Sequence, residues 1–225
     1  MIDLPRTYAE FRDYWRQHRA VLQSEYVRHR SSWLVGAVPP DALALSVPET
    51  VGMLSQRHGS AVDAALSTEY SDPELPVSET PPELRGPVAR GEAAYAEEGE
   101  SDWIRTANVV GINVRTVGSF FGLVQYLLTV PSFYNAVHLL PIWEPGVVGS
   151  LYGMSSRQIN GEFFDPALAE EYPHLDSAAR QLRAVCNLIH VTGRALGMDV
   201  IPHTDRFSEI VIAQPWLFEW LRRED

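Results

Sequence analysis

The chain has 225 residues, of which 45% are apolar and 21% are charged, a composition that is ordinary for globular proteins. This length suits one large domain or two small ones, and the composition excludes a wholly disordered, collagenous or disulfide-scaffolded chain. The net charge is −11 and no basic stripe is present, so nucleic acid and anionic membranes are not expected as partners.

The absence of lysine and the presence of a single cysteine limit which catalytic and binding sites the chain can form. All 18 basic residues are arginine, so no lysine is available for a Schiff base or a phosphate-binding loop. Cys186 is the single cysteine, and a reducing, cytoplasmic compartment is expected. No secretory signal and no membrane-spanning apolar stretch are visible. No cofactor is expected, and His203 with Asp205 lacks a third ligand at the spacing of a metal site.

Residues 1–68 have a helical pattern. Thr7 and Glu10 match a capping box, and apolar residues follow at helical spacing with arginines between them, which predicts an amphipathic helix: Tyr8, Phe11, Trp15, Leu22 and Tyr26. Its apolar face packs either on its own domain or on a partner. Two further helices are predicted, over 48–58 and from about 60 to 70.

The sequence changes character over residues 69–102. This segment contains ten acids, five prolines and two arginines, and its apolar periodicity is lost. Such a composition is typical of a solvated connection between domains. An acidic interaction segment is the alternative interpretation.

From residue 103 onward the pattern alternates between strands and helices. Strands are predicted over 107–115, 136–143 and 198–203, because these runs are rich in aliphatic residues and are bounded by turn residues. His138 lies inside the second run and is interpreted as a core histidine. Strands alternating with helical segments predict an α/β fold built on a parallel sheet.

The helices of this half are predicted from caps and spacing. One follows Ser119 and runs to residue 130, and another runs from Asp176 to Leu196, with Gly197 as its C-cap. A further helix begins over 216–223. Residues 144–175 between them show no regular pattern and are predicted to be a long irregular loop.

Three segments in this order carry a family resemblance. VHLLPIW (137–143) is followed by SLYGMSSRQINGEFFDP (150–166), and then by LGMDVIPHTDRFSE (196–209) with QPWLFEW (214–220). This set resembles the front part of the α-amylase clan, glycoside hydrolase family 13. In that family the second strand reads hLLPi, an SPYG or SPYS loop follows, the third strand reads GikVilDvVxNH, and an HpWF element comes soon after.

The resemblance implies a fold and a function. Residues 103–225 would form the first three βα units of a TIM-barrel-like (β/α)₈ sheet, preceded by the helical region 1–68 and the acidic connection 69–102. The chain would be the N-terminal portion of a glycoside hydrolase or transglycosylase acting on an α-glucan or α-glucoside. A full barrel takes about 250 residues, so its remainder would belong to a longer chain or to another chain.

No catalytic residue is expected within these 225 residues. In the family the catalytic carboxylates come from strands four, five and seven, and this sequence ends in the helix after strand three. Two alternatives stay open at this point. The chain could be a non-catalytic, amylase-like remnant that binds sugar or a protein partner, or an unrelated small α/β protein.

Five residues are candidates for substrate binding. Aromatic rings match the apolar faces of pyranose rings, so Trp143 and Tyr152 are candidates, with packing of the loop as the alternative. The resemblance places His203 where the family has its strand-end aspartate and Arg206 where it has an asparagine, with Asp205 between them. Capping of the strand by His203, and a surface ion pair of Arg206, are the alternatives.

Two positions depart from the family pattern. Phe207 stands where the family has its substrate-binding histidine, and Met154 stands where many members carry a tyrosine after the glycine. The subsite-forming residues are therefore largely altered relative to the family.

Overall fold

The structure is a computed structural model that describes residues 13, 17, 43–87, 107–201, 204–205 and 208–217. The chain divides into two compact units, Met1–Pro40 and Asp41–Asp225. In the first unit, Asp13 and Gln17 are helical and exposed, and the other residues of the predicted amphipathic helix lie outside the described residues. The account below concerns the second unit.

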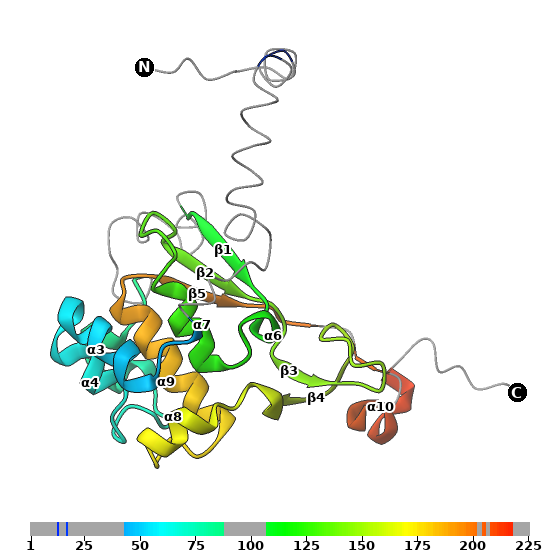
Figure 1. Cartoon of the computed structure of the whole chain (residues 1–225). Coiled ribbons are helices and arrows are strands. Elements are labelled where there is room, and N and C mark those ends of the chain that lie inside the picture. Colours follow the sequence, from blue (N-terminus) through cyan, green and yellow to red (C-terminus); the bar gives the residue numbers. More distant parts are fainter. Residues whose placement is uncertain are drawn as a thin grey trace, which may run out of the picture. The chain divides into compact units, whose positions relative to one another are not determined.

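A three-stranded parallel sheet forms the centre of the second unit (Figure 1). Its order is β1 (Val109–Ile112), β2 (Ala136–Leu139) and β5 (Ala195–Met198). The register aligns Ile112 with Leu139 and Leu139 with Met198, so the three strands end in one row. The predicted mixed α/β fold with a parallel sheet is confirmed.

The two faces of this sheet carry different side chains. Ile112, Val137 and Leu139 point to the face that is buried, with exposures of 4%, 1% and 0%, and helices α7 (Phe120–Leu127) and α9 (Ala178–Val191) lie on that side (Figure 1). The opposite face carries small side chains, where Ala136 and Ala195 form a small cluster. Because side chains alternate along a strand, His138 lies on this second face.

Helix α7 begins and packs as its sequence predicts. The Ser119 side chain caps it by accepting a hydrogen bond from the Gly122 amide at 2.9 Å, which satisfies one of the free amides of the first turn. Phe120, Phe121 and Leu123 are almost completely buried. The helix is apolar nearly all round because the sheet lies on one side of it and other helices on the other.

Helix α9 ends five residues earlier than predicted, at Val191. Gly193 has φ +79°, a conformation that glycine adopts at little cost, and it turns the chain into β5. The predicted strand over 198–203 is therefore wrong, since the paired strand covers Ala195–Met198. Gly197 is a strand residue and not a helix cap.

Two helices precede the sheet. Helix α3 (Val47–His58) has a complete capping box between Ser46 and Glu49, and it confirms the predicted helix over 48–58. Helix α4 (Ser60–Ala65) is shorter than predicted and ends before the expected position near residue 70. Both helices lie on the same side of the sheet as α9 (Figure 1).

Residues 69–87 of the predicted solvated connection follow α9 instead of leaving the domain. They include two short 3-10 helices, η1 (Val77–Glu79) and η2 (Pro82–Leu84). Three α9 side chains donate to backbone carbonyls of this segment: Asn187 to Tyr70 at 2.9 Å, Arg183 to Leu75 at 3.2 Å and His190 to Leu84 at 2.9 Å.

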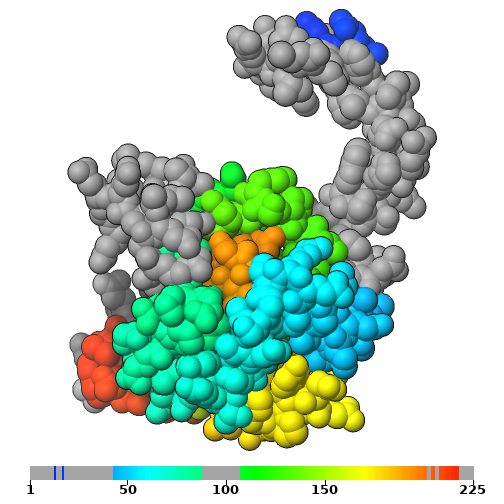
Figure 2. All heavy atoms as spheres, turned by 90° about the vertical axis from the view of Figure 1, so that its left-hand side faces the viewer, coloured from blue at the N-terminus to red at the C-terminus, as the bar shows by residue number. Residues whose placement is uncertain are grey.

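Those three α9 residues are four and three positions apart, so they form one polar stripe on the helix. On the side of the molecule shown in Figure 2, the residues from α3 to position 87 form an outer layer, and a small orange patch of the α9–β5 region remains in view beside it. Residues 88–102 lie outside the described residues.

The predicted irregular loop 144–175 contains regular structure. Strands β3 (Trp143–Pro145) and β4 (Met154–Ile159) form an antiparallel hairpin, followed by the 3-10 helix η4 (Gly161–Phe163) and helix α8 (Pro166–Glu171). Phe163 is fully buried and meets the Phe120 ring edge-to-face at 5.5 Å. The second predicted strand, 136–143, is thus divided between two sheets.

The last described elements are α10 (Glu209–Ala213) and the 3-10 helix η5 (Pro215–Leu217). The helix predicted over 216–223 is described only at its start. Three apolar side chains here are strongly exposed: Ile212, Trp216 and Leu217, at 71%, 74% and 63%. Across the described part of the chain, every helix is too short or too polar to cross a membrane.

Candidate functional site

The carboxyl ends of the parallel strands meet at one edge of the sheet. β1, β2 and β5 end at Ile112, Leu139 and Met198, and the register keeps these ends level. In parallel α/β folds, ligands bind at this edge, because the loops that follow the strands converge there. The side chains gathered at this edge define the candidate site.

Three residues at this edge are linked by hydrogen bonds. The imidazole Nε2 of His138 lies 2.8 Å from the Asp199 carboxylate, and the Trp143 indole N–H donates to the backbone carbonyl of Asp199 at 3.2 Å. Side-chain exposures of 40% for His138 and 28% for Asp199 show that the pair is open to solvent. The interpretation of His138 as a core histidine is therefore wrong.

A glycine makes room for this pair. A Cβ atom on Gly197 would lie 3.3 Å from Nδ1 of His138, closer than ordinary packing allows. Gly197 is opposite His138 in the parallel register. The absence of a side chain at 197 thus lets the imidazole lie across β5 towards Asp199.

The hairpin after β2 carries two of the predicted binding residues. Trp143 begins β3 and pairs with Ile159 of β4. Tyr152 lies in the turn before β4, and 53% of its surface is exposed. The structure therefore presents one ring beside Asp199 and a second, more exposed ring on the same hairpin.

Asp205 is brought to the same hairpin. Its backbone amide donates to the Met154 carbonyl at 2.9 Å, and the neighbouring Thr204 hydroxyl donates to that carbonyl at 2.9 Å. The Asp205 side chain lies over Gly146 so closely that a Cβ on Gly146 would be 2.4 Å from its carboxylate oxygen. Gly146 is therefore the residue that lets the segment after β5 dock on the hairpin.

The structure describes three of the five predicted substrate-binding residues. Trp143, Tyr152 and Asp205 all belong to or contact one hairpin, whereas His203 and Arg206 lie outside the described residues. The expectation that strand three ends at His203 is wrong, because β5 ends at Met198. Asp199 directly follows the strand end.

An arginine joins the loops that follow β1 and β2. Arg115, in α6 (Val114–Val117), holds the Glu162 carboxylate with two guanidinium nitrogens, and its Nη1 donates to the Gly149 carbonyl at 2.7 Å. The hydrogen bond from Arg115 lowers the pKa of the Glu162 carboxyl. This bidentate pair fixes the base of the hairpin that carries Tyr152.

Sequence reasoning missed His138, Asp199 and Gly146 as members of this site. Asp199 is a polar residue directly after a strand, and that position can identify it. The signal becomes visible only when the end of β5 is predicted correctly. His138 and Asp199 are 61 residues apart, and no local pattern connects them. Gly146 is likewise 59 residues from Asp205 in the sequence, so their close approach has no local signal.

The arrangement can bind polar ligands through both charge and ring faces. The His138–Asp199 pair offers hydrogen-bond donors and acceptors beside an indole ring, which suits a ligand that has hydroxyl groups and an apolar face. Within the described ranges, no group of three His, Cys, Asp or Glu side chains could hold a metal ion. No protein-family model, no curated protein and no solved structure matches the chain.

Proposed function

We propose that the chain is the N-terminal portion of an amylase-like glycoside hydrolase or transglycosylase that acts on α-glucosidic carbohydrate. The observation that carries this proposal is the hydrogen bond from the Trp143 indole to the Asp199 carbonyl at 3.2 Å. It brings the aromatic hairpin after β2 and the segment after β5 together at the carboxyl edge of the sheet, where carbohydrate would bind.

The sheet topology supports the proposal. In a (β/α)₈ barrel, parallel strands pair in chain order, helices cover the outside, and side chains on the inner face fill the interior. β1, β2 and β5 pair in chain order, with the β3–β4 hairpin inserted after β2. The face with α7 and α9 would be the outside, and the face with Ala136, Ala195 and His138 would be the inside.

Each site residue would then have a distinct role. Trp143 and Tyr152 would contact the apolar faces of pyranose rings, and the His138–Asp199 pair would bond sugar hydroxyls. Asp205 would hold its segment against the hairpin. His203 and Arg206 remain candidates for contacts with sugar hydroxyls, as the resemblance implies.

The catalytic carboxylates would come from barrel strands outside these 225 residues. Glycoside hydrolysis needs two carboxylates on either side of the scissile bond. Asp199 is bonded to His138 and Asp205 is packed over Gly146, so neither is disposed as one half of such a pair. The chain would therefore contribute substrate binding and the first part of the barrel.

Sugar binding tests the proposal directly. Maltotriose is titrated into the chain by calorimetry, and Tyr152→Ala is expected to weaken binding about fivefold, because one exposed stacking ring is lost. Phe133→Ala is the matched control, since this ring is 61% exposed and precedes the amino end of β2. No binding of maltotriose, or equal losses in both variants, would contradict the proposal.

A second candidate function is supported by the engagement of Asp199 with His138. A non-catalytic, amylase-like protein would bind sugar through the same hairpin without needing a carboxylate pair. The two candidates differ in turnover. Hydrolysis of an aryl α-glucoside by the product of the complete reading frame supports the first, and sugar binding without turnover supports the second.

A further inference from the structure

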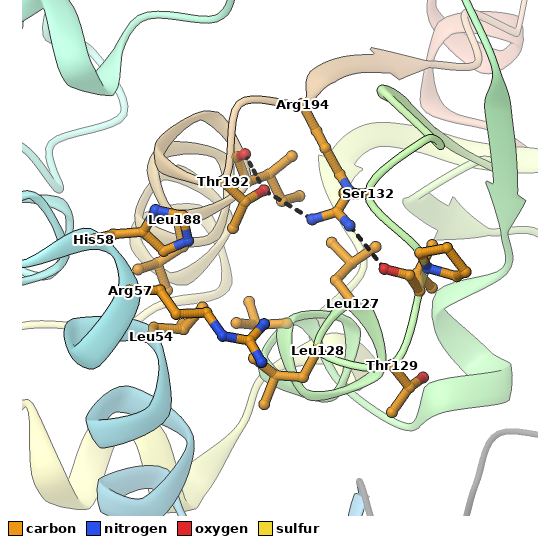
Figure 3. Close-up of a pocket in the computed structure, with 14 residues that line it drawn as sticks. Leu54, Arg57, His58, Leu127, Leu128, Thr129, Ser132, Leu188, Thr192 and Arg194 are labelled. Atoms are coloured by element: carbon orange, nitrogen blue, oxygen red, sulfur yellow. Dashed lines mark hydrogen bonds between the residues drawn. The ribbon is translucent and has the colours of Figure 1, made fainter.

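A separate pocket lies at the amino-terminal ends of β2 and β5, on the helix side of the sheet (Figure 3). Its volume is about 430 Å³, which falls within the usual range for small-molecule sites. The end of α3, the end of α7 with residues 128–132, and the end of α9 with Arg194 line it. These segments meet on the side of the molecule shown in Figure 2.

The charged residues of this pocket are all basic. Arg57 and His58 come from the last turn of α3, and Arg194 comes from the turn before β5. Among the described residues that line the pocket, none is an aspartate or a glutamate. The net charge of the chain is −11, so a concave surface whose described charges are all basic differs from the average charge of the protein.

Arg194 is buried without a carboxylate partner among the described residues. It is 8% exposed, and it donates to the Tyr134 carbonyl at 3.0 Å, the Thr192 hydroxyl at 3.1 Å and the Val130 carbonyl at 2.9 Å. All three acceptors are neutral. A buried positive charge normally has an ionic partner, and burial lowers the pKa of this guanidinium.

Arg57 brings a second guanidinium group to the pocket. Its side chain extends across the pocket beside Leu54 and Leu128 (Figure 3). Carbonyls of the loop after α7, those of Val130 and Tyr134, account for the position of Arg194. Arg57 makes no such hydrogen bond within the described part of the chain.

His58 lines the same pocket and is partly buried. Burial lowers the pKa of its imidazole most, and the charges of Arg57 and Arg194 lower it further. The two guanidinium groups therefore disfavour a positive charge on His58. An anion between the two guanidinium groups would offset their repulsion and give Arg194 an ionic partner.

The rest of the lining is mixed, with the polar side chains of Thr129, Ser132 and Thr192 and several apolar ones. Leu54, Leu127 and Leu188 are only 2%, 5% and 1% exposed, whereas Leu128 is partly exposed and Pro131 is exposed, so these two carry the open apolar surface of the pocket. A bare inorganic ion would leave this surface in contact with water, whereas a ligand with an apolar body would cover it. The combination therefore selects an anionic head attached to an apolar body.

We propose that this pocket binds a small organic anion, with a phosphate or carboxylate head at Arg57, His58 and Arg194 and an apolar body against Leu128 and Pro131. The site is separate from the strand-end edge and does not depend on carbohydrate binding there. An occupant would join α3, α7 and α9, so its binding would stabilise the helix layer against the sheet.

Calorimetric titration of the 225-residue chain with four probes tests the ligand class. Phenyl phosphate and benzoate carry both a head and a ring, inorganic phosphate carries the head alone, and phenol carries the ring alone. At least one of the first two is expected to bind about fivefold or more tightly than either inorganic phosphate or phenol. The better of the two identifies the head group.

Two substitutions test the residues. Arg57→Gln removes one charge from an exposed position and is expected to weaken binding about tenfold. Ser132→Glu places a carboxylate among the lining residues beside Arg194 (Figure 3) and is expected to abolish binding by occupying the head site. Circular dichroism verifies that both variants remain folded.

Two matched controls accompany them. Ser132→Gln has the size of the glutamate variant without its charge, and Arg180→Gln removes an arginine that pairs with Asp176 outside the pocket. Both should bind like the unchanged chain. Phenol binding as tightly as phenyl phosphate and benzoate, absence of binding by both anions, or equal losses in Arg57→Gln and Arg180→Gln would overturn the proposal.

Discussion

Replacing Gln181 with methionine tests how the segment between the β3–β4 hairpin and α9 is held. Gln181 lies in the first half of α9 and is fully buried. Its side-chain oxygen accepts from the Asp165 amide at 2.7 Å, and its side-chain nitrogen donates to the carbonyls of Asp165 at 2.8 Å and Leu175 at 3.1 Å. One side chain thus satisfies three backbone groups on either side of α8.

The substitution keeps the length of the side chain and removes all three hydrogen bonds. A typical intramolecular hydrogen bond contributes about 1 kcal/mol, and a buried polar group left without a partner costs about 1–3 kcal/mol. Three lost bonds therefore amount to about 3 kcal/mol or more, and the better burial of the methionine side chain offsets about 1 kcal/mol. We expect the free energy of unfolding to fall by about 2 kcal/mol or more.

Urea unfolding followed by circular dichroism measures this change, and hydrogen exchange of the α8 amides shows whether the loss is local. Gln158→Met is the matched control, because Gln158 is exposed on β4 and its side chain makes no hydrogen bond within the described ranges. A difference of less than about 1 kcal/mol between the two variants would refute the reasoning, since water or relaxation would then replace the three bonds.

Three further predictions concern activity and titration. The 225-residue chain should not hydrolyse an aryl α-glucoside, and activity that survives repurification and disappears on substituting Asp199 or Asp205 would contradict this. Burial raises the pKa of the Cys186 thiol to about 12, so at about pH 8 only about one thiol in 10⁴ is ionised; Ellman's reagent should react slowly with the native chain and rapidly in urea. The pKa of His58 is lowered, so the unfolded state takes up a proton first and stability should fall as pH drops below about 6.5; in His58→Gln this part of the pH dependence should disappear.

The buried strands and helix caps are the parts of the fold that the sequence predicts well. Strands β1 and β2 lie within runs of aliphatic residues, because a parallel sheet under helices needs apolar side chains. Ser119 caps α7 where that helix was predicted to begin, because a serine hydroxyl can satisfy the first free amides of a helix. Both signals are local, so they need no knowledge of tertiary contacts.

The hairpin was missed because its pattern is weak and its partner is distant. Strand β4 reads MSSRQI, with several polar side chains in a row, and such a run does not stand out as a strand. Its pairing with Trp143 depends on where β2 stops. Pro141 lies between β2 and β3 and has no amide hydrogen to continue a ladder, which is the physical reason that one apolar run becomes two strands.

The boundary between α9 and β5 was misplaced because two glycines compete for the helix end. Gly193 has the positive φ that ends the turn, whereas Gly197 lies four residues later inside the strand. Apolar residues occur both before Gly193 and between the two glycines, so periodicity alone does not decide between them. The difference lies in the register, since β5 pairs with β2 only when Ala195 stands opposite Ala136.

That register also determines which residues reach the candidate site. With His138 opposite Gly197, the first residue beyond β5 is Asp199, which is placed within hydrogen-bond distance of the imidazole. A shift of the strand by one residue would put every side chain on the opposite face of the sheet, and a side chain at position 197 would crowd Nδ1 of His138. The His138–Asp199 pair is therefore a consequence of strand pairing and of one missing Cβ, two features that become visible only when residues far apart in the sequence are brought together.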